Sequence, residues 1–158
     1  MVVRIGVRRK GARREARRLR RSLVRMMEQL APGRELELSV SLVSDGEIAA
    51  LNSEHMGLDE PTDVLSFPLL DREEARRAGA GGGPPEPIGA VVISLDTARG
   101  QASEQGAALY DELEVLAAHG LLHLFGYDHI GPNESAEMAR QERMLLGRSI
   151  IGEVTGEG

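Results

Sequence analysis

Glu35-Leu-Glu-Leu-Ser-Val-Ser-Leu-Val43 alternates polar with apolar residues, and Ser44-Asp-Gly-Glu47 follows it without a gap. Alternation with a period of two places every second side chain on the same face, so this stretch predicts a half-buried β-strand. Its buried face is expected to hold Leu36, Leu38, Val40 and Leu42. Ser44 and Glu47 have the spacing of a capping box, which predicts a helix from residue 45 to about residue 54. A strand that passes directly into a helix is typical of α+β and α/β domains.

The rest of the chain continues this succession of strands and helices. Stretches rich in valine and isoleucine predict strands, and apolar residues three or four apart predict helices. Further strands are expected at 2–7, 64–67 and 88–95, and further helices at 12–30, 96–105, 111–125 and 135–146, the last capped by Asn133. We therefore predict an α+β (or α/β) fold, a single compact domain over residues 1–151 in which a mixed sheet of about four strands is packed with helices.

Two segments fall outside this regular pattern. Residues 71–87 are rich in glycine and proline, which predicts a mobile loop that either folds over a cleft or forms a disordered insertion. Residues 152–158 are predicted to be a disordered tail.

Three of the chain's four histidines lie within eleven residues, in His119-Gly-Leu-Leu-His123-Leu-Phe-Gly-Tyr-Asp-His129. Residues four apart share one face of a helix, so His119 and His123 can bind the same metal ion. Gly126 can end the helix in a left-handed bend that brings His129 towards them. Three protein ligands leave the fourth position of a zinc ion open for water or substrate. We predict one Zn²⁺ ion in a cleft formed by a helix end and the following turn.

The same stretch also bears on the reaction. Its spacing matches the metzincin peptidase pattern HExxHxxGxxH, except that Gly120 stands where those enzymes need a glutamate as general base. Peptide hydrolysis by that route is disfavoured, whereas hydrolysis of another phosphoester or amide remains open. Asp128 is a candidate either for the general base or for the residue that holds a ligand histidine in one tautomer.

Composition limits the class of protein. The chain has 158 residues, is 41% hydrophobic, and contains no cysteine, no tryptophan, two phenylalanines and two tyrosines. These values indicate an aliphatic core, exclude disulfides and leave little aromatic surface on which nucleobases could stack. No apolar run approaches the roughly 20 residues of a membrane-spanning helix. We expect a cytoplasmic protein without membrane contact.

Charge is distributed unevenly along the chain. Residues 1–34 carry twelve arginines and lysines and two glutamates, whereas the remainder carries seven basic and twenty-three acidic residues. A cationic segment on an acidic body can bind a phosphate backbone, and Arg17 and Arg21 of the predicted first helix are candidate contacts to it. The same arginines also suit a solvated helix face, and both interpretations remain open.

The segment His119–His129 resembles the signature of the YbeY family of bacterial endoribonucleases. The segment Pro61-Thr-Asp-Val-Leu-Ser-Phe-Pro68 is similar to that family's second well-marked motif. The resemblance implies a zinc-dependent endoribonuclease that acts on single-stranded ribosomal RNA in 16S 3′ end maturation and in ribosome quality control. It also implies that the three histidines are the zinc ligands and that Asp63 and Ser66 lie near the cleft.

Two positions depart from the family pattern. Met56 stands where the family commonly has an arginine, which would stabilise charge on a phosphoryl oxygen. Gly89-Ala90 replaces a Gly-Asp pair, which removes a carboxylate. Met56 keeps a second function open, that of a ribosome-assembly factor with a structural metal site and little or no catalysis. Its partner would be a small-subunit ribosomal protein or an assembly GTPase.

Overall fold

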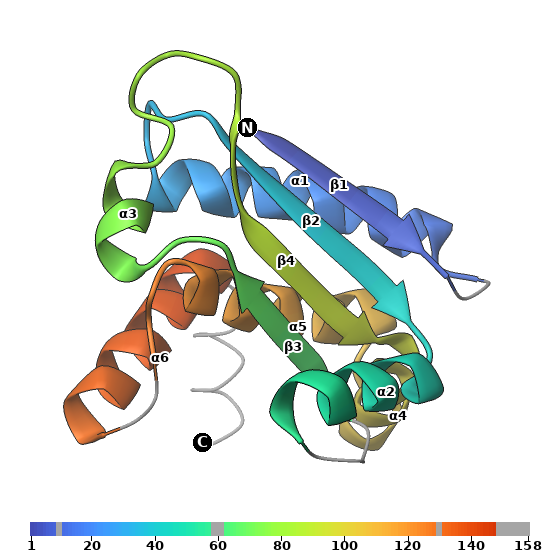
Figure 1. Ribbon diagram of the computed structural model, residues 1–158. Helices are drawn as coiled ribbons and strands as arrows, with labels where there is room; N and C mark the ends of the chain where they lie inside the picture. Colours follow the sequence, from blue (N-terminus) through green and yellow to red (C-terminus); the bar gives the residue numbers. More distant parts are fainter. Residues whose placement is uncertain (9–10, 58–61, 129–130, 148–158) are drawn as a thin grey trace.

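The computed structural model describes residues 1–8, 11–57, 62–128 and 131–147. Over these residues the chain forms one compact α+β domain (Figure 1). The strands are β1 (Val2–Val7), β2 (Leu36–Val43), β3 (Val64–Pro68) and β4 (Glu86–Ser94). The helices are α1 (Arg13–Leu30), α2 (Asp45–Met56), α3 (Arg72–Arg77), α4 (Leu95–Gln105), α5 (Leu109–Leu124) and α6 (Pro132–Leu146). The predicted fold class and all four predicted strands are confirmed.

The sheet has the strand order β1-β2-β4-β3. β1, β2 and β4 are parallel to one another, whereas β3 is antiparallel to β4. Helices α1 and α5 lie on the same face of the sheet, α1 behind β1 and β2, and α5 behind β4 and β3 (Figure 1). Helix α2 packs on one end of the opposite face. Residues next to β1 and residues next to β3 therefore lie at opposite edges of the sheet.

The main core lies between the sheet and helices α1 and α5. The predicted inner face of β2 is confirmed, since its four alternating side chains are at most 2% exposed. Helix α1 adds the apolar stripe that its sequence predicts, with fully buried Leu19, Leu23, Met26 and Met27. The arginines of α1 occupy the remaining faces. None of the described helices is long and apolar enough to cross a membrane.

The segment expected to be a loop, residues 71–87, contains helix α3 and the first residues of β4. Asp71 and Glu74 form a capping box, in which each carboxylate accepts a hydrogen bond from the other residue's backbone N–H. This Asp-x-x-Glu signal was present in the sequence, but the neighbouring glycines and prolines pointed to a loop. The expectation of an uninterrupted loop was therefore wrong, and its mobility stays a prediction.

Helix α6 begins three residues earlier than predicted. Gly131 is its N-cap and Pro132 its first residue, so Asn133 lies inside the helix and does not cap it. Proline suits the first helical position because the N–H that it lacks would have no partner there. The predicted tail at 152–158 lies outside the described residues.

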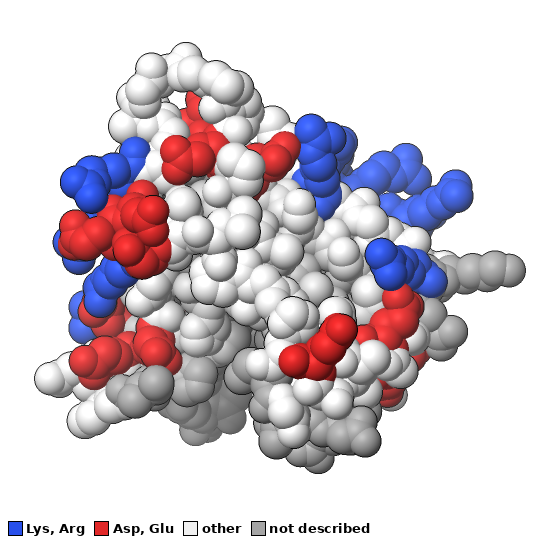
Figure 2. Space-filling view, viewed as in Figure 1, with Lys and Arg blue, Asp and Glu red and all other residues white. Residues whose placement is uncertain are grey.

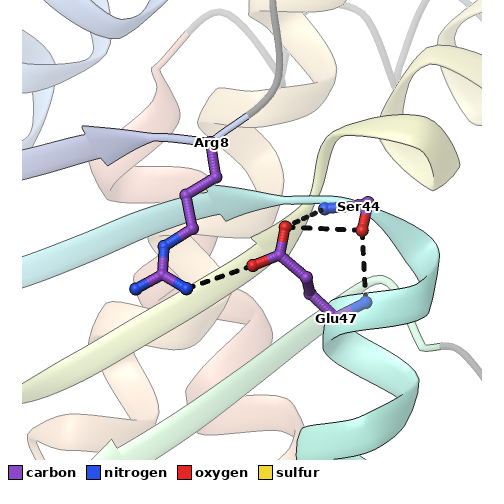
Figure 3. Close-up of polar contacts among 3 residues, drawn as sticks. All are labelled: Arg8, Ser44 and Glu47. Carbon is purple, nitrogen blue, oxygen red and sulfur yellow. Dashed lines mark hydrogen bonds and ion pairs between the residues drawn. The ribbon is translucent and has the colours of Figure 1, made fainter.

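The predicted capping box of α2 is confirmed, and an arginine from the end of β1 extends it (Figure 3). Ser44 Oγ accepts from the Glu47 N–H at 3.2 Å, and Glu47 Oε1 accepts from the Ser44 N–H at 3.4 Å. Arg8 Nη1 lies 3.1 Å from the second carboxylate oxygen of Glu47. The hydrogen bond from Arg8, assisted by the Ser44 N–H, lowers the pKa of Glu47 against an opposing effect of burial.

This ion pair predicts a loss of stability in acid. Because folding lowers the pKa of Glu47, its contribution is complete above the ordinary pKa of 4.5 and is lost as the pH falls through the lowered value. We expect Arg8→Ala to lower the free energy of unfolding by about 0.5 kcal/mol at pH 7, as for an exposed ion pair, and by less at pH 3. Urea unfolding of the wild type and of Arg8→Ala at both pH values measures the two losses. An equal loss of stability at pH 7 and pH 3 would contradict the prediction.

Candidate metal centre

His119 and His123 lie one turn apart on the face of α5 that borders a surface cleft. Their rings meet edge to face with centroids 4.8 Å apart, and their Nε2 atoms are 3.2 Å apart. Both side chains are partly exposed. The four-residue spacing on a helix therefore brings two imidazole nitrogens together, as the sequence predicts.

Helix α6 holds the ring of His119 from its other side. Glu142 Oε1 lies 2.6 Å from His119 Nδ1. A carboxylate at this nitrogen favours the tautomer that carries its proton on Nδ1, which leaves the lone pair of Nε2 for a ligand. The sequence suggested Asp128 for this role and contained no local sign of Glu142. A contact between two helices, over a separation of 23 residues, leaves no local pattern.

The two facing nitrogens suit a tetrahedral metal ion. Zinc–nitrogen bonds of about 2.0–2.1 Å at the tetrahedral angle separate two ligand nitrogens by about 3.3 Å. The Nε2 atoms of His119 and His123 are 3.2 Å apart. The predicted third ligand, His129, lies outside the described residues, and the part of the chain that is described contains no group of three or more metal-binding side chains. Zinc thus stays a prediction, and the two described histidines fit it.

Gly126 forms the bend that the sequence predicts after α5. Its φ angle is +91°, a conformation that favours glycine, and the Tyr127 N–H donates to the Leu122 carbonyl at 3.0 Å across the turn. A Cβ atom at position 126 would lie 2.7 Å from Arg72 Cγ, so the turn also packs closely on α3. Asp128 follows the turn, is partly buried, and is not among the residues that line the cleft.

The cleft beside the histidines has a volume of about 510 Å³, and β3 forms its second wall. Asp63 and Ser66 both line it, next to His119 and His123. Ser66 Oγ donates to the Gly120 carbonyl at 3.0 Å, a bond that joins β3 to α5. The structure therefore brings together two described histidines and the two residues that the family resemblance implied.

A buried carboxyl group, Glu112, lies two turns before His119 on the same face of α5 and is only 7% exposed. Burial raises the pKa of Glu112, and the nearby charge of Asp63 raises it further. Nothing in the sequence singled out Glu112, because an acidic residue in the first turn of a helix is ordinary.

Arg17 and Arg21 do not line the histidine cleft. Arg17 borders two surface cavities near β1, one shared with Arg4 and Arg20 and the other with Arg13. Arg21 borders a third cavity, between α1 and the end of α6. Figure 2 shows basic side chains along the β1 edge, whereas β3 and the cleft occupy the other edge of the sheet. A molecule that contacts both Arg17 and the cleft must span the sheet.

The two departures from the family pattern lie on different elements. Met56 is the last residue of α2. Ala90 lies in β4 next to Val91, whose side chain points towards Gly120 of α5. Side chains alternate along a strand, so a carboxylate at position 90 would point to the other face of the sheet. The missing Asp at this position therefore removes nothing from the histidine cleft.

Gly120 lets α5 approach the sheet closely. A Cβ atom at this position would lie 2.7 Å from Val91 Cγ1 and 3.2 Å from Ser66 Oγ. Val91 is 1% exposed and is branched at Cβ, so its methyl groups have little freedom to move away. The residue that excludes a peptidase-type base therefore also sets the distance between the histidine helix and its neighbouring strands.

We expect Gly120→Ala to lower the free energy of unfolding by about 1–2 kcal/mol, because overpacking outweighs the gain in helix propensity. Gly100→Ala in α4 is the matched control. Nothing lies within 4 Å of a Cβ atom at Gly100, so this variant should be more stable than the wild type by about 1 kcal/mol. Urea titration measures both, and equal stabilisation by the two substitutions would show that the close contact is absent.

Known proteins resemble this chain over most of its length. A family model described as Endoribonuclease YbeY matches residues 7–149. Proteins named Endoribonuclease YbeY are 47% identical over 116 residues in Pelotomaculum thermopropionicum (73% of this chain, 74% of that one) and 42% identical over 159 residues in Anaeromyxobacter sp. (100% and 78%). A solution structure of a Thermotoga maritima protein matches with a TM-score of 0.63 and 28% identity, and covers 98% of this chain and 93% of that one.

Proposed function

The chain belongs to the YbeY family of endoribonucleases, and we propose that it is a zinc-dependent endoribonuclease that cuts single-stranded ribosomal RNA in the cytoplasm. The enzyme would act in 16S rRNA 3′ end maturation and in ribosome quality control. One observation carries the proposal: two imidazole Nε2 atoms 3.2 Å apart in the cleft beside β3. Family membership supports RNA as the substrate class.

His119 and His123 would hold the ion through Nε2, with His129 as the third ligand. Bound zinc supplies Lewis acidity towards a phosphate oxygen and favours a nucleophilic water near neutral pH. Glu142 contributes through His119, because its carboxylate holds the Nδ1 proton and orients the ring. A site of three imidazole ligands would leave the ion open to the substrate or to water.

Asp63 is the carboxylate among the described residues that line the cleft. A carboxylate within reach of a water molecule can accept its proton during attack, so we assign Asp63 the role of general base. The Gln101 side-chain amide donates to Asp63 Oδ2 at 3.4 Å and helps to orient it.

The arginines of α1 would hold the RNA at a distance from the reaction. Arg17 borders two cavities on the β1 side of the molecule, each lined by further arginines. Contacts of this kind to phosphates contribute affinity and salt dependence but no choice of sequence. The choice of cleavage site would then depend on the shape of the RNA or on the ribosome, which would bind the protein as a partner.

Met56 favours a second function of a different class. Methionine cannot stabilise charge on a phosphoryl oxygen, as an arginine at this position would. A member without this charge could serve as a ribosome-assembly factor that retains a structural metal and binds a small-subunit ribosomal protein or an assembly GTPase.

The test is cleavage of an end-labelled, single-stranded RNA that contains the 3′ end of 16S rRNA. Purified protein is stripped of metal, and one half is reloaded with one equivalent of zinc. We expect cleavage by the reloaded protein alone, and none of the same sequence in a perfect duplex. Zinc bound at one equivalent without any cleavage would favour the assembly factor over the nuclease.

A further inference from the structure

Among the described residues, β3 is the last strand of the sheet and pairs with β4 alone (Figure 1). Two hydrogen bonds of the residues that flank β3 show which of its residues form hydrogen bonds with β4. The Ser94 N–H donates to the Asp63 carbonyl at 2.9 Å, and the Leu69 N–H donates to the Ile88 carbonyl at 3.0 Å. Bonded positions alternate along an antiparallel pair. Odd-numbered residues of this segment therefore turn their backbone groups to β4, and even-numbered ones turn theirs to the free edge.

The even-numbered residues are Val64, Ser66 and Pro68, and all three line the histidine cleft. Val64 and Ser66 each present a backbone N–H and a carbonyl at the free edge, whereas proline has no N–H to present. The alternation turns these groups away from β4, and the turn, loop and cap hydrogen bonds of the described residues include none of them. The cleft therefore has an ordered row of donors and acceptors along one wall, next to His119 and His123 on the other.

The chemistry of this row suits an extended ribose–phosphate backbone. Two N–H groups on alternate residues lie about 6.8 Å apart along a strand, a separation similar to one extended nucleotide. Backbone N–H groups are common donors to phosphate oxygens. Carbonyl oxygens repel phosphates, but they accept hydrogen bonds from hydroxyl groups. In a nucleic acid backbone the 2′-hydroxyl of RNA is such a donor, and DNA lacks it.

We propose that the free edge of β3 is a binding subsite for the backbone of the strand to be cut, and that it selects RNA over DNA. The N–H groups of Val64 and Ser66 donate to phosphate oxygens, and the carbonyls of the same residues accept from 2′-hydroxyls. This inference rests on the proposed nuclease function and names the groups that bind its substrate. An extended peptide is the other molecule that can pair with a strand edge, and the experiment includes it.

The first arm removes one donor from the protein. Val64→Pro deletes the N–H that points to the free edge of β3. An edge strand tolerates proline where the N–H points outwards, and Pro68 is such a residue, four positions further along the same strand. Val64→Ala loses the side chain but keeps the N–H, so the ratio between the two variants reports on the N–H alone. Zinc-loaded proteins are titrated against a fluorescein-labelled single-stranded RNA by anisotropy. We expect Val64→Pro to bind about tenfold more weakly than Val64→Ala, the loss of one charge-assisted hydrogen bond.

The second arm changes the substrate and needs no variant, so it decides the question even if Val64→Pro fails to fold. Single 2′-deoxy substitutions are placed along the RNA, and wild-type affinity is measured for each. We expect one or two adjacent positions at which the substitution weakens binding about fivefold. Uniform affinity at all positions, or equal RNA binding by a folded Val64→Pro and Val64→Ala, would overturn the proposal. A peptide could also occupy the edge instead of RNA. If an extended peptide binds Val64→Ala but not Val64→Pro, while both variants bind RNA equally, the proposal is overturned as well.

Cleavage by the wild type separates this inference from the function on which it rests. Metal-dependent cleavage together with no sensitivity to the Val64 N–H or to 2′-deoxy substitution would remove the β3 subsite and leave the nuclease intact. Zinc-loaded wild type that binds no RNA and cuts none would remove both.

Discussion

Replacement of His123 by alanine should abolish both stoichiometric zinc binding and RNA cleavage while the domain stays folded. We expect kcat/KM to fall by about 10³-fold or more, because a bound metal contributes several kcal/mol to stabilisation of the transition state. The imidazole is partly exposed at the end of α5, so its removal leaves the buried leucines of the helix in place. Metal analysis, an RNA cleavage assay and thermal unfolding of the same preparation measure its zinc content, its activity and its stability.

His55→Ala is the matched control for the loss of an imidazole. His55 lies on α2, and its ring contacts Phe67 with centroids 5.0 Å apart, outside the set of residues that line the cleft. This variant should keep one equivalent of zinc. If His123→Ala loses its fold together with its metal, the ion is structural and the assembly factor becomes the better description. If His123→Ala keeps full zinc and full activity, the metal centre is wrong.

Glu142→Gln should weaken zinc binding by about 10–100-fold, the usual cost of losing the carboxylate behind a metal-binding histidine. The glutamine side chain can still reach His119 Nδ1, but it carries no charge to hold the Nδ1 proton. Glu142→Ala removes the contact entirely, and its zinc affinity should be reduced at least as much. Competition with a chromophoric zinc chelator measures the affinities of the wild type and both variants.

Excess zinc distinguishes this positioning role from a structural one. Glu142→Gln should regain most of its cleavage activity at high zinc, since the ligand nitrogens are still present. His123→Ala should not regain activity under the same conditions. Unchanged zinc affinity in Glu142→Gln, or activity that stays low when zinc saturates the protein, would show that Glu142 does not act through His119.

Local patterns in the sequence predicted the elements of this fold well. Alternation in β2, the capping box of Ser44 and Glu47, and the stripe of α1 each depend on residues close together in the chain, and all three are confirmed. Helix α3 was missed although it carries a capping box of its own, because glycines and prolines follow it closely. Local signals are reliable where they agree with one another and fail where they compete.

The candidate site was predictable only in part. His119 and His123 follow from a spacing within one helix, and Asp63 and Ser66 followed from the resemblance to a family. Glu142 depends on how α6 packs against α5, and the strand order decides that β3 borders the cleft while Arg17 lies beyond β1. Such long-range placements are set by tertiary packing, which no spacing along the chain encodes.

The close contact at Gly120 also limits what this architecture can become. A lineage that kept the three-histidine spacing would gain the general base of the metzincin type by placing a glutamate at position 120. Even the first carbon of that side chain would meet Val91 Cγ1 at 2.7 Å, so β4 and β3 would have to move away from α5 before the new base could fit. That movement would separate β3 from the histidines. In evolutionary terms, a change to the metzincin type of base would therefore disturb the existing site before the new base could act.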